Sequence, residues 1–291
     1  MPGFELWSDA ERKHVNDVLE TGILMRYGFD GPRKGVWKAK ELEQEICNSF
    51  GSKHAQLVSS GTAALTTALS ALGIGYGDEV IMPAFTFVAS FEAVISVGAV
   101  PVMVDVDDTL TLDPAAVKAA ITPKTKCIMP VHMCGSMADM DALQAICKEH
   151  KLLLLEDACQ AIGGTYKGKK LGTIGDAGTF SFDFVKTITC AEGGVVMTNS
   201  EDTYIKCDGY SDHGHDHVGN DRGAEPHPFI GYNFRISELH AAVGLAQIKR
   251  LPEFLAIQKK NHAALKNILA TIPEISFRRI PDPEGDSCTF L

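Results

Sequence analysis

Residues 179–194 read Thr-Phe-Ser-Phe-Asp-Phe-Val-Lys-Thr-Ile-Thr-Cys-Ala-Glu-Gly-Gly and place Lys186 between a strand-like run and a pair of glycines. The aromatic and β-branched neighbours indicate that this lysine is not an ordinary solvated one. Desolvation disfavours the ammonium form, so such an amine can be neutral near pH 7 and can form a Schiff base with a carbonyl. The alternative is a lysine at the rim of a strand whose charged end reaches solvent.

Outward from this stretch, apolar strand-like runs alternate with amphipathic helical segments. Strands are predicted at 54–58, 78–82, 100–106, 126–131, 152–156 and 194–198. Helices are predicted at 8–20, 38–50, 61–72, 87–97, 114–121, 139–150 and 202–210, and from Ser237 onward with a kink or break at Pro252. This alternation is typical of an α/β fold whose mostly parallel sheet is flanked by helices on both faces. Ligands of such sheets bind beyond the carboxyl ends of the strands.

Composition excludes several classes of function. The chain has 291 residues, 45% of them hydrophobic, and a formal net charge of -10, so nucleic acid and anionic membranes are not its expected partners. Eight cysteines without a C-x-x-C spacing indicate a reducing compartment, and we expect a cytoplasmic protein. The first nine residues do not resemble a signal peptide, and the longest apolar run, 93–104, is too short to span a bilayer. Small-molecule chemistry is therefore expected.

Two segments have the residue types of a binding site. Ser60-Gly61-Thr62 joins a strand to a helix, where free backbone N–H groups and a hydroxyl can cradle a phosphate; a simple helix cap is the alternative. Glu156 and Asp157 end a buried strand, and at most one of them can face a given pocket. A carboxylate there could keep a pyridine nitrogen protonated, as pyridoxal phosphate (PLP) chemistry requires, or could be a structural acid.

Two familiar nucleotide-binding patterns do not fit the sequence. The glycines of 73–77 have the wrong spacing for a dinucleotide-binding loop and follow a helix, so they predict a turn. Residues 163–170 resemble a P-loop, but Lys170 replaces the Ser or Thr that would bind magnesium. ATP binding is therefore not expected.

Taken together, the motifs resemble the DegT/StrS family of sugar aminotransferases, from about Phe4 to Leu265. The resemblance is carried by residues 60–65, 83–89, 156–158, 181–186, 192–194 and 231–235. It implies the fold of aspartate aminotransferase, known as PLP fold type I, with PLP as the cofactor. Many relatives read Thr-Thr-Gly-Glu-Gly-Gly after the lysine, whereas this chain has Thr189-Cys-Ala-Glu192 before the last two glycines, so we expect altered loop packing there.

The resemblance also assigns roles to single residues. Lys186 would form a Schiff base with PLP and then move the proton of the substrate carbon. Asp157 would pair with the pyridine nitrogen, Gln160 would lie near the phenolic oxygen, and Phe87 would stack on the ring.

The remaining assigned roles concern the phosphate group of PLP and the contact between two subunits. The resemblance implies that Gly61, Thr62 and Ser181 would bind the phosphate. Asn233 would reach the phosphate of the other subunit, so a homodimer with shared active sites is expected.

Within the family, residues 131–136, 157–164 and 211–217 are most similar to members that aminate the C8 aldehyde of 8-oxo-3,8-dideoxy-manno-octulosonate, with glutamate as donor. That sugar is a precursor of lipopolysaccharide. The alternatives are amination of a nucleotide-linked keto-sugar and a catalytically idle homologue. Relatives that dehydrate a sugar carry His in place of the reactive Lys, so Lys186 argues against dehydration.

Residues 1–250 are expected to form a large PLP-binding domain with an amino-terminal helical segment. Residues 251–291 are expected to begin a small carboxy-terminal α/β domain that this chain truncates. The long loop 211–233 contains His213, His215 and His217, which could share one side of an extended segment and bind a metal. No acidic or Cys ligand of matching spacing accompanies them, so we expect no metal and propose substrate contact across the dimer interface instead.

Overall fold

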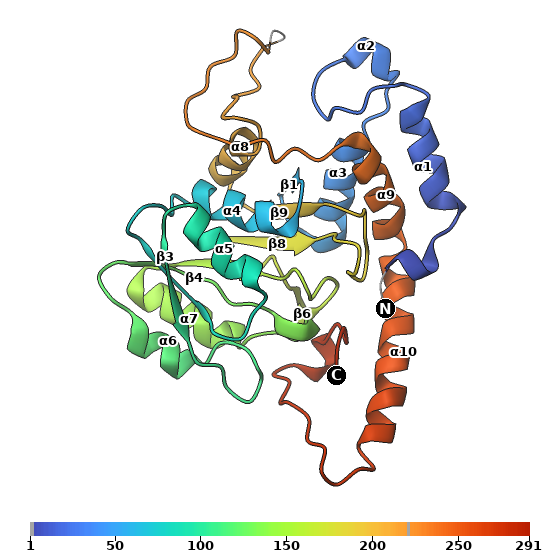
Figure 1. The fold of residues 1–291 in the computed structure, drawn as a ribbon. Helices are drawn as coiled ribbons and strands as arrows, with labels where there is room; N and C mark the ends of the chain where they lie inside the picture. The colour runs from blue at the N-terminus through green and yellow to red at the C-terminus, as the bar shows by residue number, and fades with distance from the viewer. Residues whose placement is uncertain (1–2, 220–221) are drawn as a thin grey trace.

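The computed structural model describes residues 3–219 and 222–291, and its centre is a sheet of seven strands in the order β1-β9-β8-β5-β4-β2-β3 (Figure 1). The strands are β1 (His54–Val58), β2 (Glu79–Pro83), β3 (Val100–Val104), β4 (Thr125–Ile128), β5 (Leu153–Asp157), β8 (Ala177–Ser181) and β9 (Gly194–Thr198). Strand β9 is antiparallel to β1 and β8, and every other neighbouring pair is parallel. The predicted mostly parallel sheet is therefore confirmed.

Ten α-helices surround this sheet in the described part of the chain. They are α1 (Asp9–Leu19), α2 (Asp30–Arg33), α3 (Lys38–Phe50), α4 (Gly61–Ala71), α5 (Val88–Ser96), α6 (Pro114–Ala120), α7 (Met140–His150), α8 (Glu201–Tyr210), α9 (Glu238–Lys249) and α10 (Leu251–Leu269). Local sequence explains where two of these helices begin. Ser8 and Glu11 form a reciprocal capping box at the amino terminus of α1, and Asp113 caps α6 before Pro114. None of the described helices is long and apolar enough to cross a membrane.

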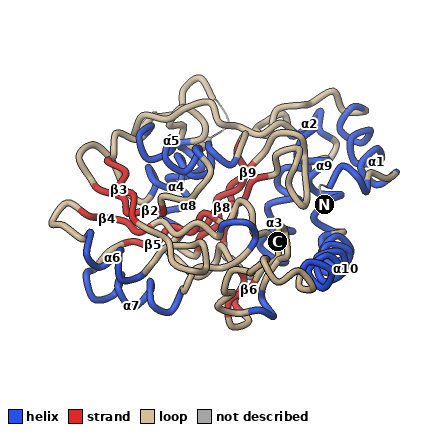
Figure 2. The backbone as a smooth tube through the Cα atoms, turned by 60° about the horizontal axis from the view of Figure 1, so that its bottom comes forward, coloured by secondary structure: helices blue, strands red, loops and turns tan. Residues whose placement is uncertain are grey.

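Two hydrophobic cores lie on opposite faces of the sheet. One contains buried side chains of α4, α5 and α8, and the other contains those of α3, α6, α7, α9 and α10. Figure 2 shows the strands as a band with α4, α5 and α8 on one side and α6 and α7 on the other, while α1, α9 and α10 lie together beyond β9. Because both faces are covered, most residues of the inner strands are buried, whereas Val100 and Met103 of the edge strand β3 are exposed.

Three features differ from the sequence prediction. The predicted break of the final helix occurs at Arg250 and not at Pro252. Pro252 lies in the first turn of α10, where a backbone N–H would have no partner within the helix. The predicted strand 126–131 ends at Ile128 and continues only as a single bridge from Val131 to Asp157. Residues 163–170 contribute the unpredicted hairpin β6 (Thr165–Tyr166) and β7 (Lys169–Lys170), whose strands are too short to show periodicity.

The segment after α10 returns to the large sheet domain. It includes a 3-10 turn at Pro283–Gly285 beside β6 and runs to Leu291, and Figure 1 shows this end next to the hairpin. Leu251 and Phe254 of α10 are buried in the same core as α9. Other 3-10 turns occur at Gly3–Leu6 and Met133–Gly135.

Candidate active site

A cavity of about 490 Å³ opens at the carboxyl ends of the central strands. Seven of the eight residues proposed from sequence to contact a cofactor line it: Gly61, Thr62, Phe87, Asp157, Gln160, Ser181 and Lys186. The eighth, Asn233, does not. Residues more than a hundred positions apart thus meet at one place because parallel strands deliver their following loops to the same edge of the sheet.

The amino terminus of α4 forms one wall of the cavity. The Ser60 hydroxyl caps this helix by accepting from the N–H of Ala63 at 3.0 Å, which leaves the first N–H groups of the helix directed at the cavity. At Gly61, a Cβ atom would stand 2.7 Å from Cβ of Ser181, and at Gly194 a Cβ atom would stand 2.2 Å from the carbonyl oxygen of Ser60. Glycine at these two positions therefore allows the helix end to approach β8 and β9.

Asp157 at the end of β5 forms the opposite wall. Its side chain is 4% exposed, and Oδ2 accepts a hydrogen bond of 2.7 Å from the Ser90 hydroxyl of α5. Oδ1 accepts from the backbone N–H of Cys159 at 3.2 Å. Ser90 in turn lies 2.8 Å from the Thr86 hydroxyl. No described Lys, Arg or His forms an ion pair with Asp157, so neutral donors hold its carboxyl group, which also lines the cavity.

Glu156, the preceding residue, faces the other side of the sheet. Its carboxylate is fully buried and accepts from the N–H groups of Gly172, Ile174 and Gly175 at 2.6–2.8 Å. His132 lies 3.0 Å away through Nε2, and its Nδ1 accepts from the N–H of Ala138, so Nε2 is the nitrogen that donates to Glu156. The sequence argument that only one of the two carboxylates can face the pocket is confirmed.

Lys186 lies in the turn that follows β8 and is half-buried in the cavity wall. Its N–H donates to the carbonyl of Asp183, and its carbonyl accepts from Gly3 at 2.9 Å. The neighbours Phe184 and Val185 are 51% and 64% exposed, so they do not form the apolar surroundings expected from sequence. The position of Lys186 on the cavity, and not burial by its neighbours, separates it from an ordinary surface lysine.

Gln160 and Phe87 both line the cavity. The Gln160 oxygen accepts from the backbone N–H of Cys134 at 3.0 Å, which fixes the side chain at the wall. Phe87 precedes α5 and is 63% exposed, so a flat ring can still stack on it. Thr289 and Phe290 also line the cavity, although nothing in the sequence connected this segment with the site.

Asn233 is exposed and lies in a segment that pairs with the loop after α8. A single antiparallel bridge joins it to Asp212, and the N–H of Phe234 donates to Ser211 at 2.9 Å. The side chain is therefore presented to the outside of the described chain and not to its own cavity. The predicted loop 211–233 is present, although its residues 220–221 lie outside the described part.

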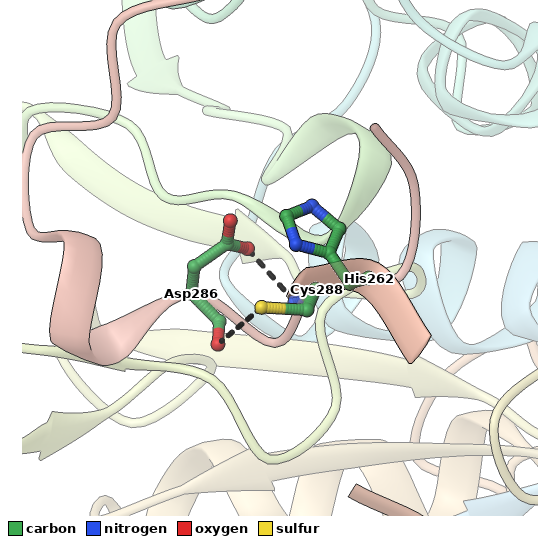
Figure 3. A group of neighbouring side chains, drawn as sticks. All are labelled: His262, Asp286 and Cys288. Carbon is green, nitrogen blue, oxygen red and sulfur yellow. Dashed lines mark hydrogen bonds between the residues drawn. The ribbon is translucent and has the colours of Figure 1, made fainter. Parts of the chain in front are cut away.

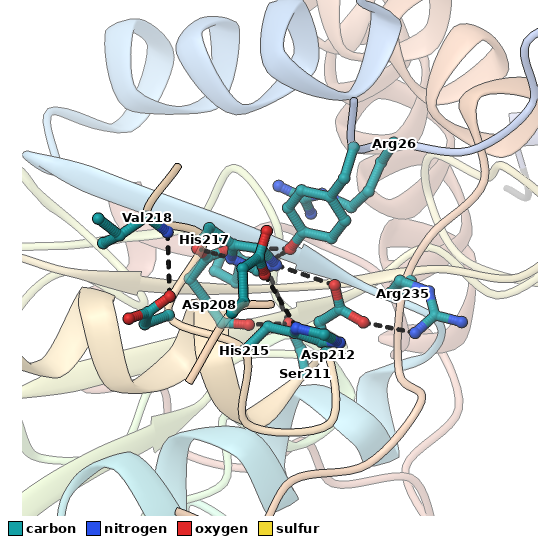
Figure 4. A network of polar contacts seen from close by, with 12 residues as sticks. Arg26, Asp208, Ser211, Asp212, His215, His217, Val218 and Arg235 are labelled. Atoms are coloured by element: carbon teal, nitrogen blue, oxygen red, sulfur yellow. Dashed lines mark hydrogen bonds and ion pairs between the residues drawn. The ribbon is translucent and has the colours of Figure 1, made fainter. Parts of the chain in front are cut away.

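The three histidines of this loop do not lie on an extended segment, which corrects the sequence expectation. His213 and His217 have left-handed backbone conformations, with φ of 57° and 52°. His217 lies between two carboxylates, with Nδ1 at 2.6 Å from Asp208 and Nε2 at 2.9 Å from Asp212, and its ring stacks on Tyr27 (Figure 4). His215 points instead toward Glu225, at 2.9 Å.

Asp212 is the centre of this network. Arg222 and Arg235 both donate to it, and the carboxylate is fully buried. Burial alone would raise the pKa of Asp212, but hydrogen bonds from His217, Arg222 and Arg235 hold it well below its usual range. Burial would likewise lower the pKa of His217, but the two carboxylates raise it to about 9. The ring is thus a cation at neutral pH and joins α8 to the loop.

Comparison with known proteins agrees with this geometry. A sequence profile described as the DegT/DnrJ/EryC1/StrS aminotransferase family matches residues 8–290. GDP-perosamine synthase of Caulobacter vibrioides is 43% identical over 226 residues, which are 76% of this chain and 58% of that protein. The solved structure of 3-amino-5-hydroxybenzoic acid synthase is 38% identical with a TM-score of 0.88, covering 97% of this chain and 72% of the other.

A second similar structure is the GDP-4-keto-6-deoxy-D-mannose-3-dehydratase of E. coli, described with bound hydrated PLP. It is 29% identical with a TM-score of 0.86, covering 97% of this chain and 75% of the other. The present chain spans about three fifths of the length of the curated relatives that it matches.

The charge on His217 predicts a pH-dependent contribution to stability. Because the folded-state pKa of about 9 is above the ordinary value of 6.5, the contribution is fully present below pH 6.5 and is lost as pH rises through about 9. We expect His217→Gln to lower the free energy of unfolding by about 2 kcal/mol near pH 6, less than the full shift implies because solvent screens a half-buried pair.

Urea unfolding near pH 6 and at about pH 9.5 measures this effect, with His150→Gln as a control on a more exposed histidine. The difference between wild type and His217→Gln should shrink at the higher pH. A difference that stays constant across this range would show that the charge on His217 is not its source.

Proposed function

Because the chain belongs to the DegT/DnrJ/EryC1/StrS aminotransferase family, we propose that it is a PLP-dependent aminotransferase that moves an amino group from glutamate to an oxo-sugar. The observation that carries the proposal is the convergence of Lys186, Asp157 and the amino terminus of α4 on one cavity. An amine, a buried acid and a phosphate cradle are the three parts that this chemistry needs. The relatives named above as synthases of amino compounds support it.

The residues of the cavity fit PLP. The cradle at Gly61 and Thr62 is kept open by glycine, since the contact with Ser181 leaves no room for a Cβ atom. Asp157 is buried with two neutral donors and no ion-pair partner among the described residues, so a protonated pyridine nitrogen would complete its environment. The exposed face of Phe87 leaves a surface on which an aromatic ring can stack.

When bound, PLP supplies an electron sink for the electron pair released at the carbon that carries nitrogen. Nζ of Lys186 would hold the cofactor covalently and, once displaced by the amino donor, would take the proton from that carbon and deliver it to C4' of the cofactor. Asp157 would keep the pyridine nitrogen protonated. Ser90 would act as a positioning residue by fixing the Asp157 carboxylate.

Two classes of acceptor are consistent with the cavity. The motifs at 131–136, 157–164 and 211–217 favour the C8 aldehyde of 8-oxo-3,8-dideoxy-manno-octulosonate, the step expected for a lipopolysaccharide sugar. The name of GDP-perosamine synthase favours a nucleotide-linked keto-sugar. Both acceptors have a carbonyl group that can receive the amino group. They differ in the rest of the molecule, which is a free sugar acid in the first class and a nucleotide-linked sugar in the second.

We further infer that two copies of the chain share their active sites. Asn233 is exposed and does not line the cavity of its own chain, and the segment that carries it is held by the Asp212 network. In a homodimer this side chain would donate to the phosphate in the partner's cavity.

Lys186→Ala should leave PLP bound without a covalent link and lower turnover at least ~100-fold, because the proton-transferring amine is removed. Borohydride reduction followed by peptide mapping should place the cofactor on the peptide containing Lys186 in the wild type and on no peptide in the variant. Lys206→Ala, a change at an exposed lysine of α8, is the control. Unchanged turnover in Lys186→Ala would contradict the proposal.

Ser90→Ala should lower kcat about tenfold, or ~1.4 kcal/mol, with little change in KM for the acceptor, since it removes one hydrogen bond to a buried charge. Ser96→Ala, on the same helix but bonded to Thr66, should leave kcat unchanged. Steady-state measurement of kcat and KM for both variants compares the two substitutions. Equal effects of both substitutions would assign the loss to α5 as a whole.

The acceptor is tested by single turnover. Protein incubated with glutamate and then separated from it should transfer nitrogen to one member of a panel of aldehydo- and keto-sugars, measured by mass spectrometry. Amination of the octulosonate aldehyde supports the first class, and amination of a nucleotide-linked keto-sugar supports the second. Release of a deoxy product without nitrogen, or transfer to none of the panel, would count against an aminotransferase.

A further inference from the structure

A second group of chemically versatile side chains lies beside the active-site cavity. His262 projects from α10, and Asp286 and Cys288 lie on the segment that follows the last 3-10 turn (Figure 3). One potential ligand atom from each residue lies within 4.8 Å of the other two. They are brought together only by the return of residues 286–288 to the side of α10.

The Asp286 carboxylate gives a reason to expect a ligand here. Its side chain is 2% exposed, and Oδ1 accepts from the N–H of Cys288 at 2.9 Å. Oδ2 is buried and has no hydrogen-bond partner in the described part of the chain. A buried carboxylate oxygen without a donor is costly, and a cation next to it removes that cost.

We propose that His262, Asp286 and Cys288 bind a divalent metal ion with the ligand preference of Zn²⁺. Imidazole, carboxylate and thiolate are all ligands of zinc, and three protein ligands leave a fourth tetrahedral position open. Bonds of about 2.0–2.3 Å would place the ligand atoms ~3.3–3.8 Å apart, so the three side chains need only a small closure from the observed separation. A carboxylate and a thiolate together neutralise the charge of the ion.

The proposed metal site lies beside a second cavity. His262 and Asp286 line this cavity of about 170 Å³, whose wall also includes Lys266 and Arg278. These two cations would repel a metal ion, so the anionic ligands Asp286 and Cys288 are needed to offset them. The same cavity shares Cys134 and Phe290 with the active-site cavity. The ion would therefore act on the wall of the active site without entering it.

Residues 286–289, which the metal ion would bind to α10, already form hydrogen bonds with both α10 and the loops at the edge of the sheet. Gln258 of α10 donates to the Ser287 carbonyl at 2.7 Å, and the Ser287 hydroxyl donates to Gly135 at 2.8 Å. Thr289 donates to the carbonyl of Gln160 at 3.0 Å. A metal bond to His262 would add a second tie from α10 to this segment. The sequence expectation of no metal was drawn for His213, His215 and His217, which lie in the loop after α8.

Cobalt titration of the full chain, after removal of metals by chelation, tests the proposal. Co²⁺ should bind with one equivalent per chain and produce thiolate-to-cobalt charge-transfer absorption, which Zn²⁺ should abolish by displacement. Cys288→Ser should remove this absorption, and His262→Ala should weaken binding more than about tenfold. Cys134→Ser removes a half-buried thiol from the same cavity and should leave the spectrum unchanged.

His262 is half-buried on a helix surface, so His262→Ala is expected to fold even if Cys288→Ser does not, and circular dichroism checks both. Zn²⁺ should raise the melting temperature of the wild type but not of His262→Ala. Cobalt binding without thiolate absorption, or equal binding by wild type and His262→Ala, would overturn the proposal. These readouts do not depend on aminotransfer, so they stand or fall separately from the proposed function.

Discussion

The alternation of side chains at the carboxyl end of β5 puts Glu156 and Asp157 on opposite faces of the sheet, and the geometry of the site depends on it. Glu156 accepts three backbone hydrogen bonds and faces His132, so the strand end is held from the side away from the cavity. Asp157 is consequently fixed in the cavity wall, where Ser90 orients it. Hydrogen bonds on both faces of the strand end therefore fix the position of this carboxylate.

Close approach of backbone segments is the second constraint. The amino terminus of α4 lies against the ends of β8 and β9, at contacts that leave no space for a Cβ atom at Gly61 or Gly194. These glycines bring the free N–H groups of the helix to the same cavity as Asp157 and Lys186. The distances between cradle, acid and amine are therefore set by the packing of the main chain, which is stiffer than the side chains that use it.

Two segments outside the sheet are each held by a network of polar contacts. The loop after α8 is held by Asp212, where one buried carboxylate binds a histidine cation and two arginines. The segment 286–289 is held between α10 and the turn at Gly135, and it completes the wall of the cavity. Both segments are anchored by polar contacts, which are directional, so they can place single side chains where apolar packing alone would not.

Much of the fold and most of the candidate site follow from local sequence. Helix α3 and strands β1 and β9 have the predicted limits, because period, caps and buried runs report on neighbours in the chain. Seven of the eight residues proposed for the site line the cavity, and that set was implied by the resemblance of the motifs to a family. The partner of Asp157, by contrast, is Ser90, 67 positions away, and no local pattern marks such a contact.

The sequence by itself determined the α/β class, the order of the strands along the chain and seven residues that line the cavity. The tertiary structure alone decided the antiparallel placement of β9, the direction of Asn233 and the meeting of His262 with Asp286 and Cys288. The reason is physical: propensity and periodicity act over a few residues, whereas these features depend on how distant surfaces pack against one another.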